Sequence, residues 1–173
     1  MRQFYFFLPR IMLYTTLLLF LTACQQSSSI PEGFYDYQKE KAENAAAELS
    51  FSPNLPEYVP MEVAFLVSDR YYLNDSEKEA LDISLYTQEN DLLSIQFIQG
   101  NIETGLIDAE TVMIDEQLEG EYVDNSFAKI LSWKKDGITY KMSYRENTLG
   151  TTQEKNNNVS KQDLVQVARS FHS

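Results

Sequence analysis

Residues 128–145 read AKILSWKKDGITYKMSYR, and this stretch decides the predicted fold. At its centre lies Asp136-Gly137, a dipeptide typical of type I′ turns, which join two antiparallel strands through a two-residue loop. The runs on either side, 128–135 and 138–145, alternate apolar or aromatic residues with polar ones. The stretch therefore predicts a β-hairpin.

The register of this hairpin follows from the length of its turn. A two-residue loop sets Trp133 opposite Tyr140 and Leu131 opposite Met142. Aromatic and aliphatic side chains then share one face of the sheet, and each such cross-strand pair contributes about 0.2–1 kcal/mol. We expect this face to point into the core.

A second hairpin is predicted upstream, where residues 80–88 and 92–99 both alternate apolar and polar side chains. A two-residue loop at 90–91 would mix apolar with polar positions, because a slip of one residue moves every side chain to the other face. A three-residue loop at 89–91 keeps the apolar side chains together. The predicted pairs are Leu85 with Ile95 and Ile83 with Phe97.

Less regular segments complete the predicted sheet. We expect a strand at 62–68 and another at 111–118, the second broken by Glu119-Gly120 before a short run at 122–123. Residues 71–76 and 147–159 are polar or rich in turn formers and are expected to be loops, the second of them mobile. The chain thus contains about six strands.

A helix is predicted at each end of the sheet. Residues 32–49 are rich in alanine and glutamate, and their apolar face consists of Tyr35, Ala42, Ala45, Ala46 and Leu49. Residues 50–60 contain three prolines and should be extended. Ser160-Lys161-Gln162-Asp163 resembles a capping box that opens the last helix. The apolar stripe of that helix is Leu164, Val167, Ala168 and Phe171.

Strands joined by short turns favour an antiparallel sheet with one covered face, and the two amphipathic helices supply the cover. The predicted class is α+β, with about six antiparallel strands and an N-terminal and a C-terminal helix packed on them. Residues 32–173 are enough for one domain with its own core.

The N-terminus has the features of a secretory signal peptide over residues 1–23. Arg2 and Arg10 precede a short apolar run, 11–20, and no acidic residue occurs before Cys24. The run is shorter than the roughly 20 apolar residues that a membrane span needs. Residues 24–31 follow as a polar tether.

Leu21-Thr22-Ala23-Cys24 resembles the lipobox of bacterial lipoproteins, in which a leucine stands three residues before the modified cysteine and small residues fill the gap. The resemblance implies attachment of diacylglycerol to the Cys24 sulfur and cleavage before Cys24. Two acyl chains anchor a domain stably, at about 0.8 kcal/mol per buried CH₂. We therefore expect a protein attached to the cell membrane through its lipid, on the extracytoplasmic face.

The charge of the chain excludes one class of partner. After cleavage, twelve Lys and Arg residues remain against 26 Asp and Glu residues, a formal net charge of −14. Nucleic acid needs basic patches, so we expect no nucleic-acid partner. An anionic membrane surface would also repel the domain, which leaves the lipid as its attachment.

Three segments of the globular part resemble an extracytoplasmic domain found in Gram-positive lipoproteins and in anti-sigma regulators. They are the proline-rich entry 52–60, the tryptophan hairpin 131–140 and the closing helix 160–171. The resemblance implies a curved antiparallel sheet with helices, and the family has no agreed activity. The chain lacks the cytoplasmic zinc-type segment and transmembrane helix of the regulators, so a regulator role is not implied.

Residues suited to catalysis or metal binding are scarce. The only histidine, His172, lies one residue from the C-terminus, where we expect a frayed tail. Cys24 is the only cysteine, so no disulfide or cysteine-based metal site is available. An acidic group is expected to be a solvated edge rather than a glycosidase pair or calcium site. It comprises Asp108, Glu110, Asp115, Glu116, Glu119, Glu121 and Asp124.

Most of the aromatic residues are expected in the core, whereas Tyr71, Tyr72, Tyr86 and Tyr144 are expected to be exposed. The favoured function is a lipid-anchored binding or sensing domain without catalytic activity or cofactor, whose protein partner is unknown. The alternative is a carrier for a hydrophobic ligand held between sheet and helices. A hydrolase is the least supported, because no base and nucleophile lie together.

Overall fold

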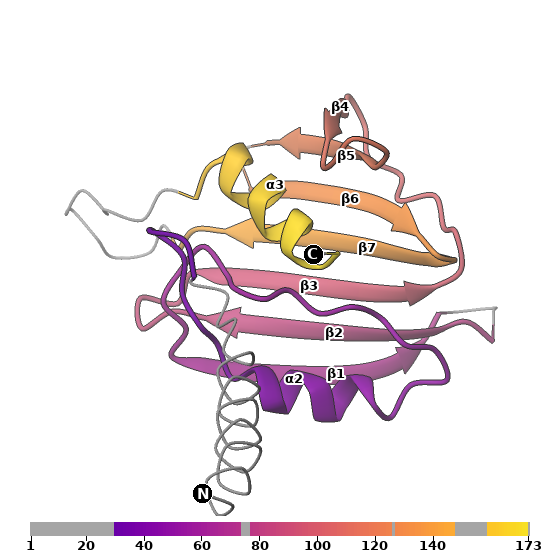
Figure 1. Ribbon diagram of the computed structural model, residues 1–173, viewed down its shortest axis with the longest axis horizontal. Helices are drawn as coiled ribbons and strands as arrows, with labels where there is room; N and C mark the ends of the chain where they lie inside the picture. The colour runs from indigo at the N-terminus through magenta and orange to yellow at the C-terminus, as the bar shows by residue number, and fades with distance from the viewer. Residues whose placement is uncertain (1–29, 74–76, 126, 148–158, 173) are drawn as a thin grey trace, which may run out of the picture.

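The computed structural model describes residues 30–73, 77–125, 127–147 and 159–172. The signal peptide, the lipobox and most of the tether lie outside these residues, as does most of the expected loop at 147–159. The described residues form one antiparallel sheet with two helices on one of its faces (Figure 1). The class is α+β.

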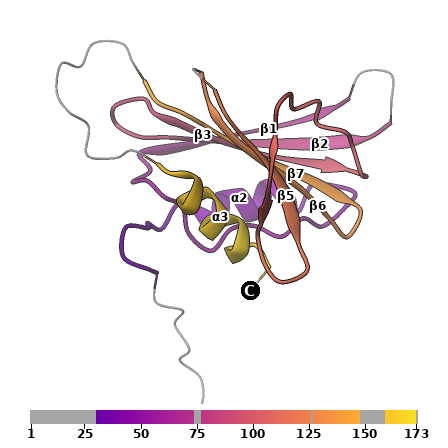
Figure 2. The same ribbon diagram turned by 90° about the horizontal axis from the view of Figure 1, so that it is seen from above.

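The sheet has seven strands in the order β1-β2-β3-β7-β6-β5-β4. The strands are β1 Phe65–Tyr72, β2 Glu79–Tyr86, β3 Leu92–Gln99, β4 Glu110–Met113, β5 Glu119–Asp124, β6 Lys129–Lys135 and β7 Ile138–Arg145. The helices are α2 Lys39–Ala46 and α3 Lys161–Ser170. Figure 2 shows that the sheet is strongly twisted, as sheets of L-residues are, with both helices below it.

The β6–β7 hairpin has the predicted register. Trp133 pairs with Tyr140 and Leu131 pairs with Met142. The turn residues have positive φ angles, 51° at Asp136 and 74° at Gly137, as a type I′ turn requires. The rings of Trp133 and Tyr140 are stacked with their centroids 5.1 Å apart.

The β2–β3 hairpin keeps the predicted faces but not the predicted register. Leu85 pairs with Leu93 and Ile83 pairs with Ile95, two residues away from the expected pairs. The loop has the predicted three residues but lies one position earlier, at 88–90, because the Thr87 N–H donates to Asp91 O at 3.1 Å and continues the ladder to this pair. The Thr87 side chain explains this: Thr87 Oγ1 accepts the Asp91 N–H at 3.0 Å and Thr87 O accepts the Asn90 N–H at 3.2 Å. These hydrogen bonds close the loop one residue earlier in the chain than predicted.

The strand expected at 111–118 is found only in its first part, and the sheet gains a seventh strand because the chain turns after it and returns as β5. β4 ends at Met113, the chain turns, and Glu119-Gly120 begin β5 instead of breaking a strand. Gly120 pairs with Trp133, and a Cβ at this position would lie only 3.0 Å from Ile114 Cδ1 and from Ser132 O. The glycine is therefore a packing requirement and not a strand break.

β1 is shifted from its expected place at 62–68. Its pairing with β2 runs from Phe65 to Tyr72, so Tyr71 and Tyr72 belong to a strand and not to a loop. One step beyond, the Leu73 N–H donates to Lys78 O at 3.0 Å. The limits of β1 are set by its pairing with the regularly alternating strand β2. The sequence of β1 itself has no clear alternation.

α2 is shorter than the expected helix at 32–49. Tyr35 lies outside it and forms a two-way backbone bridge with Val59, at 2.9 and 3.0 Å. The Tyr37 hydroxyl donates to Pro56 O at 2.8 Å. The extended segment 50–61 thus takes residues 34–37 as a partner, which prevents them from joining the helix.

α3 begins as predicted, and the capping box at Ser160 is confirmed. Ser160 Oγ accepts the Asp163 N–H at 3.2 Å, and Asp163 Oδ2 accepts the Ser160 N–H at 2.8 Å. Leu164, Val167 and Ala168 are fully buried. The predicted stripe therefore packs on the sheet.

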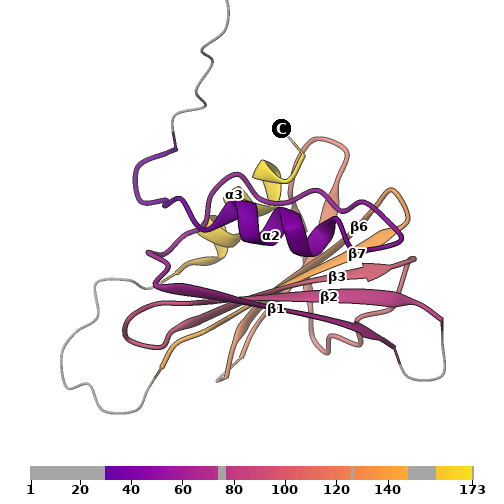
Figure 3. The same cartoon turned by 90° about the horizontal axis from the view of Figure 1, so that it is seen from below.

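The core lies between the helices and the covered face of the sheet (Figure 3). The segment 50–61 passes between the two helices (Figure 1) and adds the buried Met61 to the core cluster that also contains Met142 of β7. The largest completely buried side chains are Tyr140, Phe97, Met61, Leu81, Ile83, Leu85, Leu93, Ile95, Ile114, Leu131, Met142 and Leu164.

Candidate binding surfaces

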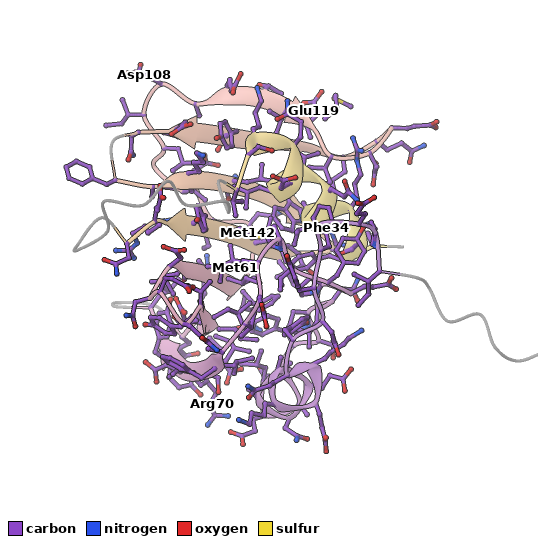
Figure 4. All side chains as sticks on the ribbon, turned by 90° about the vertical axis from the view of Figure 1, so that its left-hand side faces the viewer. Phe34, Met61, Arg70, Asp108, Glu119 and Met142 are labelled. Carbon is purple, nitrogen blue, oxygen red and sulfur yellow. The ribbon has the colours of Figure 1, made fainter. Side chains whose placement is uncertain are left out.

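The acidic group at the β4–β5 end is exposed, as expected of a solvated edge. All seven carboxylates lie on exposed residues. Glu110 is paired with Lys161 of α3 at 2.9 Å, and Glu121 accepts a hydrogen bond from the Thr104 hydroxyl at 3.3 Å. In the part of the chain that the structure describes, no group of three potential ligands could hold a metal ion. Figure 4 shows Asp108 and Glu119 at this edge, far from Arg70.

His172 is not part of a frayed tail. Its Nε2 atom lies 3.1 Å from the Trp133 indole nitrogen, and its ring contacts Trp133 and Tyr140 edge to face. An aromatic cluster around Phe171 holds it in place, with Phe171 5.2 Å from Trp133 and 5.7 Å from Tyr140 between ring centroids. The sequence did not reveal these contacts of His172, because they are made with residues of β6 and β7 that are distant in the chain.

The hydrogen bonds of His172 define its tautomer. The Trp133 indole can only donate, so Nε2 must carry a lone pair and the proton must sit on Nδ1. Nδ1 lies 3.4 Å from Asn54 Nδ2, so this tautomer requires the Asn54 amide to be turned, with its oxygen accepting the Nδ1 proton. Burial lowers the pKa of His172, and the nearby Lys135 lowers it further, against Asp115 and Asp136. The imidazole is thus held neutral as a structural acceptor.

An open cleft of about 570 Å³ lies beside this histidine, between α2, the proline segment and the β6–β7 turn. Its lining is mixed, with Lys39, Glu43 and Asp136 beside Leu55 and Phe171. The cleft therefore offers charged and apolar contacts side by side.

The expected exposure of four tyrosines is only partly found. Tyr144 is 3% exposed and belongs to the core, because it lies on the covered face of β7. Burial raises its pKa above the ordinary value, and Asp91 and Glu146 add to the shift. Tyr72 is 61% exposed, whereas Tyr71 and Tyr86 are half-buried.

The face of the sheet opposite the helices is open around β1 and β2. Phe65 and Val67 are 45% and 50% exposed there, and Phe65 stacks on Tyr86 with 4.7 Å between ring centroids. These positions alternate with the buried side of each strand. They form an apolar corner at the β1–β2 end of the open face.

Asp82 lies beside this corner and accepts three hydrogen bonds. Oδ1 accepts from the Ser84 hydroxyl at 2.9 Å, while Oδ2 accepts from the Ser94 hydroxyl and the Gln96 amide, both at 3.0 Å. The donors come from β2 and β3, so the carboxylate is held in one orientation on the open face. Directly across the ladder lies a second carboxylate, that of Asp69 in β1.

β1 forms one edge of the sheet. A groove of about 360 Å³ separates this edge from α2, with Asn44 and Ala45 on one wall and Ser68 on the other. Arg70 closes one end of the groove, because its Nη1 donates to Glu48 O at 2.6 Å and lies 3.7 Å from Glu79. We call β1, this groove and the apolar corner the β1 surface.

Sequence reasoning missed the β1 surface because it placed β1 too early. The signal was nonetheless present: Asp82, Ser84, Ser94 and Gln96 occupy the polar positions of two alternating strands, which predicts one shared face. Only the observed register brings their side chains onto a single carboxylate.

No described helix is long and apolar enough to cross a membrane. Leu21, Thr22, Ala23 and Cys24 lie outside the described residues, so lipidation stays a prediction. Comparison of the chain with protein-family models, with curated protein sequences and with solved structures found no match. The resemblance to the extracytoplasmic domain of lipoproteins therefore also stays a prediction.

Proposed function

We propose that this chain is a lipid-anchored extracytoplasmic domain that binds or senses a partner and has no catalytic activity. The N-terminal sequence with Cys24 supports the anchor. The observation that carries the binding role is the β1 surface, where large apolar side chains remain exposed next to an oriented carboxylate. Contiguous exposed apolar patches are a typical feature of protein interaction sites.

The packing of the interior favours binding of a partner at the surface over transport of a hydrophobic ligand inside the domain. The space between sheet and helices is occupied by completely buried side chains such as Phe97, Met142 and Leu164. A carrier of acyl chains would need a cavity of several hundred Å³ in that place. The cleft beside His172 is large enough but open, and its lining carries charged residues.

The anchor is tested by labelling growing cells with palmitate. We expect label on the natural chain and none on Cys24→Ala. Label that persists in Cys24→Ala would contradict the anchor.

The binding role is tested by photo-crosslinking in intact cells. A photoreactive residue replaces Val67 on the β1 surface or, as a matched control, the exposed Gln117 in the β4–β5 turn. We expect a discrete adduct of higher mass from position 67 and none from position 117. Equal adducts at both positions, or none at either, would contradict a specific contact.

A further inference from the structure

The following inference rests on the proposed function and names the kind of partner. We propose that an extended segment of a partner protein adds as a strand to the free edge of β1, with a lysine or arginine of that segment opposite Asp69.

The backbone of β1 is prepared for another strand. In an antiparallel ladder, residues whose N–H and C=O point to one neighbour alternate with residues that point to the other. Leu73 bonds to Lys78 of the β2 side, which places the odd-numbered residues of β1 on β2. The N–H and C=O groups of Leu66, Ser68 and Arg70 therefore face the free edge.

Apart from its two charged residues, Asp69 and Arg70, this edge carries little of the usual protection. Sheet proteins commonly block their edges with proline, lysine, bulges or short strands. β1 pairs with β2 over eight successive residues and contains neither proline nor lysine. Its one cation, Arg70, folds back onto Glu48 of the α2 side. In Figure 3, which looks onto this edge, no described segment crosses in front of β1.

The charges select a cationic partner. Asp69 lies directly opposite Asp82, and like charges in this relation destabilise a sheet. Asp82 is satisfied by hydroxyl and amide donors, and no cation forms an ion pair with either carboxylate among the described residues. A cation on an added strand would lie next to Asp69 in a non-hydrogen-bonded pair, where side chains are closest. Binding would then relieve the repulsion.

The neighbours of Asp69 define the rest of the segment. Val67 and Tyr71 flank it on the same face, so apolar residues two positions before and after the cation would pack against them. On the other face, the residues between would lie over the groove at Ser68 and Ala45. Small or hydroxyl side chains fit that space. The expected segment is apolar–small–cationic–small–apolar.

A second copy of the chain is the less favourable occupant. Symmetric pairing centred on Asp69 would set two copies of that carboxylate face to face, and pairing centred on Arg70 would do the same with two guanidinium groups. Pairing centred on Ser68 avoids both but still brings together two chains whose formal net charge is −12 before processing.

The test uses the full chain in detergent and a labelled heptapeptide, Ser-Val-Thr-Lys-Thr-Val-Ser, with blocked ends, followed by fluorescence anisotropy. The first control replaces the lysine by glutamate. The second pair carries an N-methyl group either on the third residue, whose N–H faces β1 in the proposed pairing, or on the fourth, whose N–H faces away. We expect about tenfold weaker binding for the glutamate peptide and for the third-residue methyl peptide. The fourth-residue methyl peptide should bind as the parent does.

Two protein variants complete the test. Asp69→Asn should abolish the preference for lysine over glutamate while melting no lower than the natural chain, because a like-charge pair is removed. Ser68→Pro removes one N–H from the free edge without touching the ladder to β2, and it should abolish binding of both peptides, whereas Ser68→Ala should not.

The outcomes separate this proposal from the proposed function. Absence of peptide binding, equal affinity for the lysine and glutamate peptides, or equal effects of the two methyl groups would each overturn strand addition. So would sedimentation of the natural chain as a dimer that Ser68→Pro converts to a monomer, because β1 would then pair with itself. A crosslink from position 67 that survives these failures would leave the binding role standing with another kind of contact.

Discussion

Gly120 lies in β5 on the covered face of the sheet, directly opposite Trp133. Its hydrogen leaves room for Ile114, which folds over it from the β4–β5 turn and is completely buried. The backbone oxygen of Ser132 is equally close on the other side. A residue that sequence patterns mark as a strand break is thus the place where the turn enters the core.

We expect Gly120→Ala to lower the free energy of unfolding by about 1–3 kcal/mol, because the added methyl group overpacks this site. The measurement is chemical denaturation of the purified chain. Ile114→Val in the same chain should recover part of the loss, since it removes the Cδ1 atom that lies 3.0 Å from the new Cβ. A fully additive double variant would contradict the contact.

His172 offers a second test at the scale of one residue. Its neutral form accepts the Trp133 N–H, and burial disfavours its charged form. The imidazole should therefore titrate below its ordinary pKa of 6.5, and Trp133→Phe should move the pKa back toward that value. NMR measures both directly, because the chain has one histidine.

The sign of the pH effect follows from the direction of that shift. A histidine whose pKa is lowered in the folded state contributes stability that is complete above pH 6.5 and is lost as the pH falls through the folded-state pKa. The melting temperature of the natural chain should accordingly fall more between pH 7 and pH 5 than the melting temperature of His172→Phe. A pKa at or above 6.5 would contradict the role of His172 as a neutral acceptor.

Among the helices and strands, the β6–β7 hairpin and the start of α3 were predicted correctly, because each depends on a turn or cap formed by residues that are close in the chain. Asp136-Gly137 has the backbone freedom of a type I′ turn, and the pairs on either side agree with it. Ser160 and Asp163 close α3 through two reciprocal hydrogen bonds. α2 has no side-chain cap at Gln38, and its start is determined by the bridge between Tyr35 and Val59.

The cap of α3 can be tested without touching the core. Ser160→Ala removes the oxygen that accepts the Asp163 N–H, and we expect a loss of about 1 kcal/mol in the free energy of unfolding. Ser52→Ala, at an exposed serine of the proline segment, is the matched control and should change little. Equal losses in the two variants would indicate that the capping box contributes nothing.

For the molecule as a whole, the excess of acidic residues has a measurable cost. The chain has 26 Asp and Glu residues against 14 Lys and Arg residues. The ion pairs between described side chains, such as Lys161–Glu110 and Lys134–Glu103, engage few of the acids. Self-repulsion of this kind weakens a compact state and is screened by salt.

We therefore expect the melting temperature to rise by a few degrees as NaCl increases from about 10 mM to 150 mM, where the Debye length falls from about 30 Å to about 8 Å. Differential scanning calorimetry at pH 7 measures this. KCl should act equally, because screening depends on ionic strength. A melting temperature that falls with salt would mean that attractive pairs outweigh the repulsion.

Sequence patterns were enough to predict the antiparallel α+β class, the β6–β7 hairpin with its register, the faces of β2 and β3, and the cap and stripe of α3. Each of these depends on residues that are neighbours in the chain or lie across a short turn, so the physical signal is local. The sequence also predicted the lipobox at Cys24, which lies outside the described residues.

Contacts between distant parts of the chain set the limits of β1, the place of Gly120 in β5, the burial of Tyr144 and the position of His172. Each depends on a partner far away in the sequence: β2 sets the extent of β1, Ile114 fills the space above Gly120, and Trp133 holds His172. The opposition of Asp69 and Asp82 arises in the same way, since a strand's register determines which side chains become neighbours.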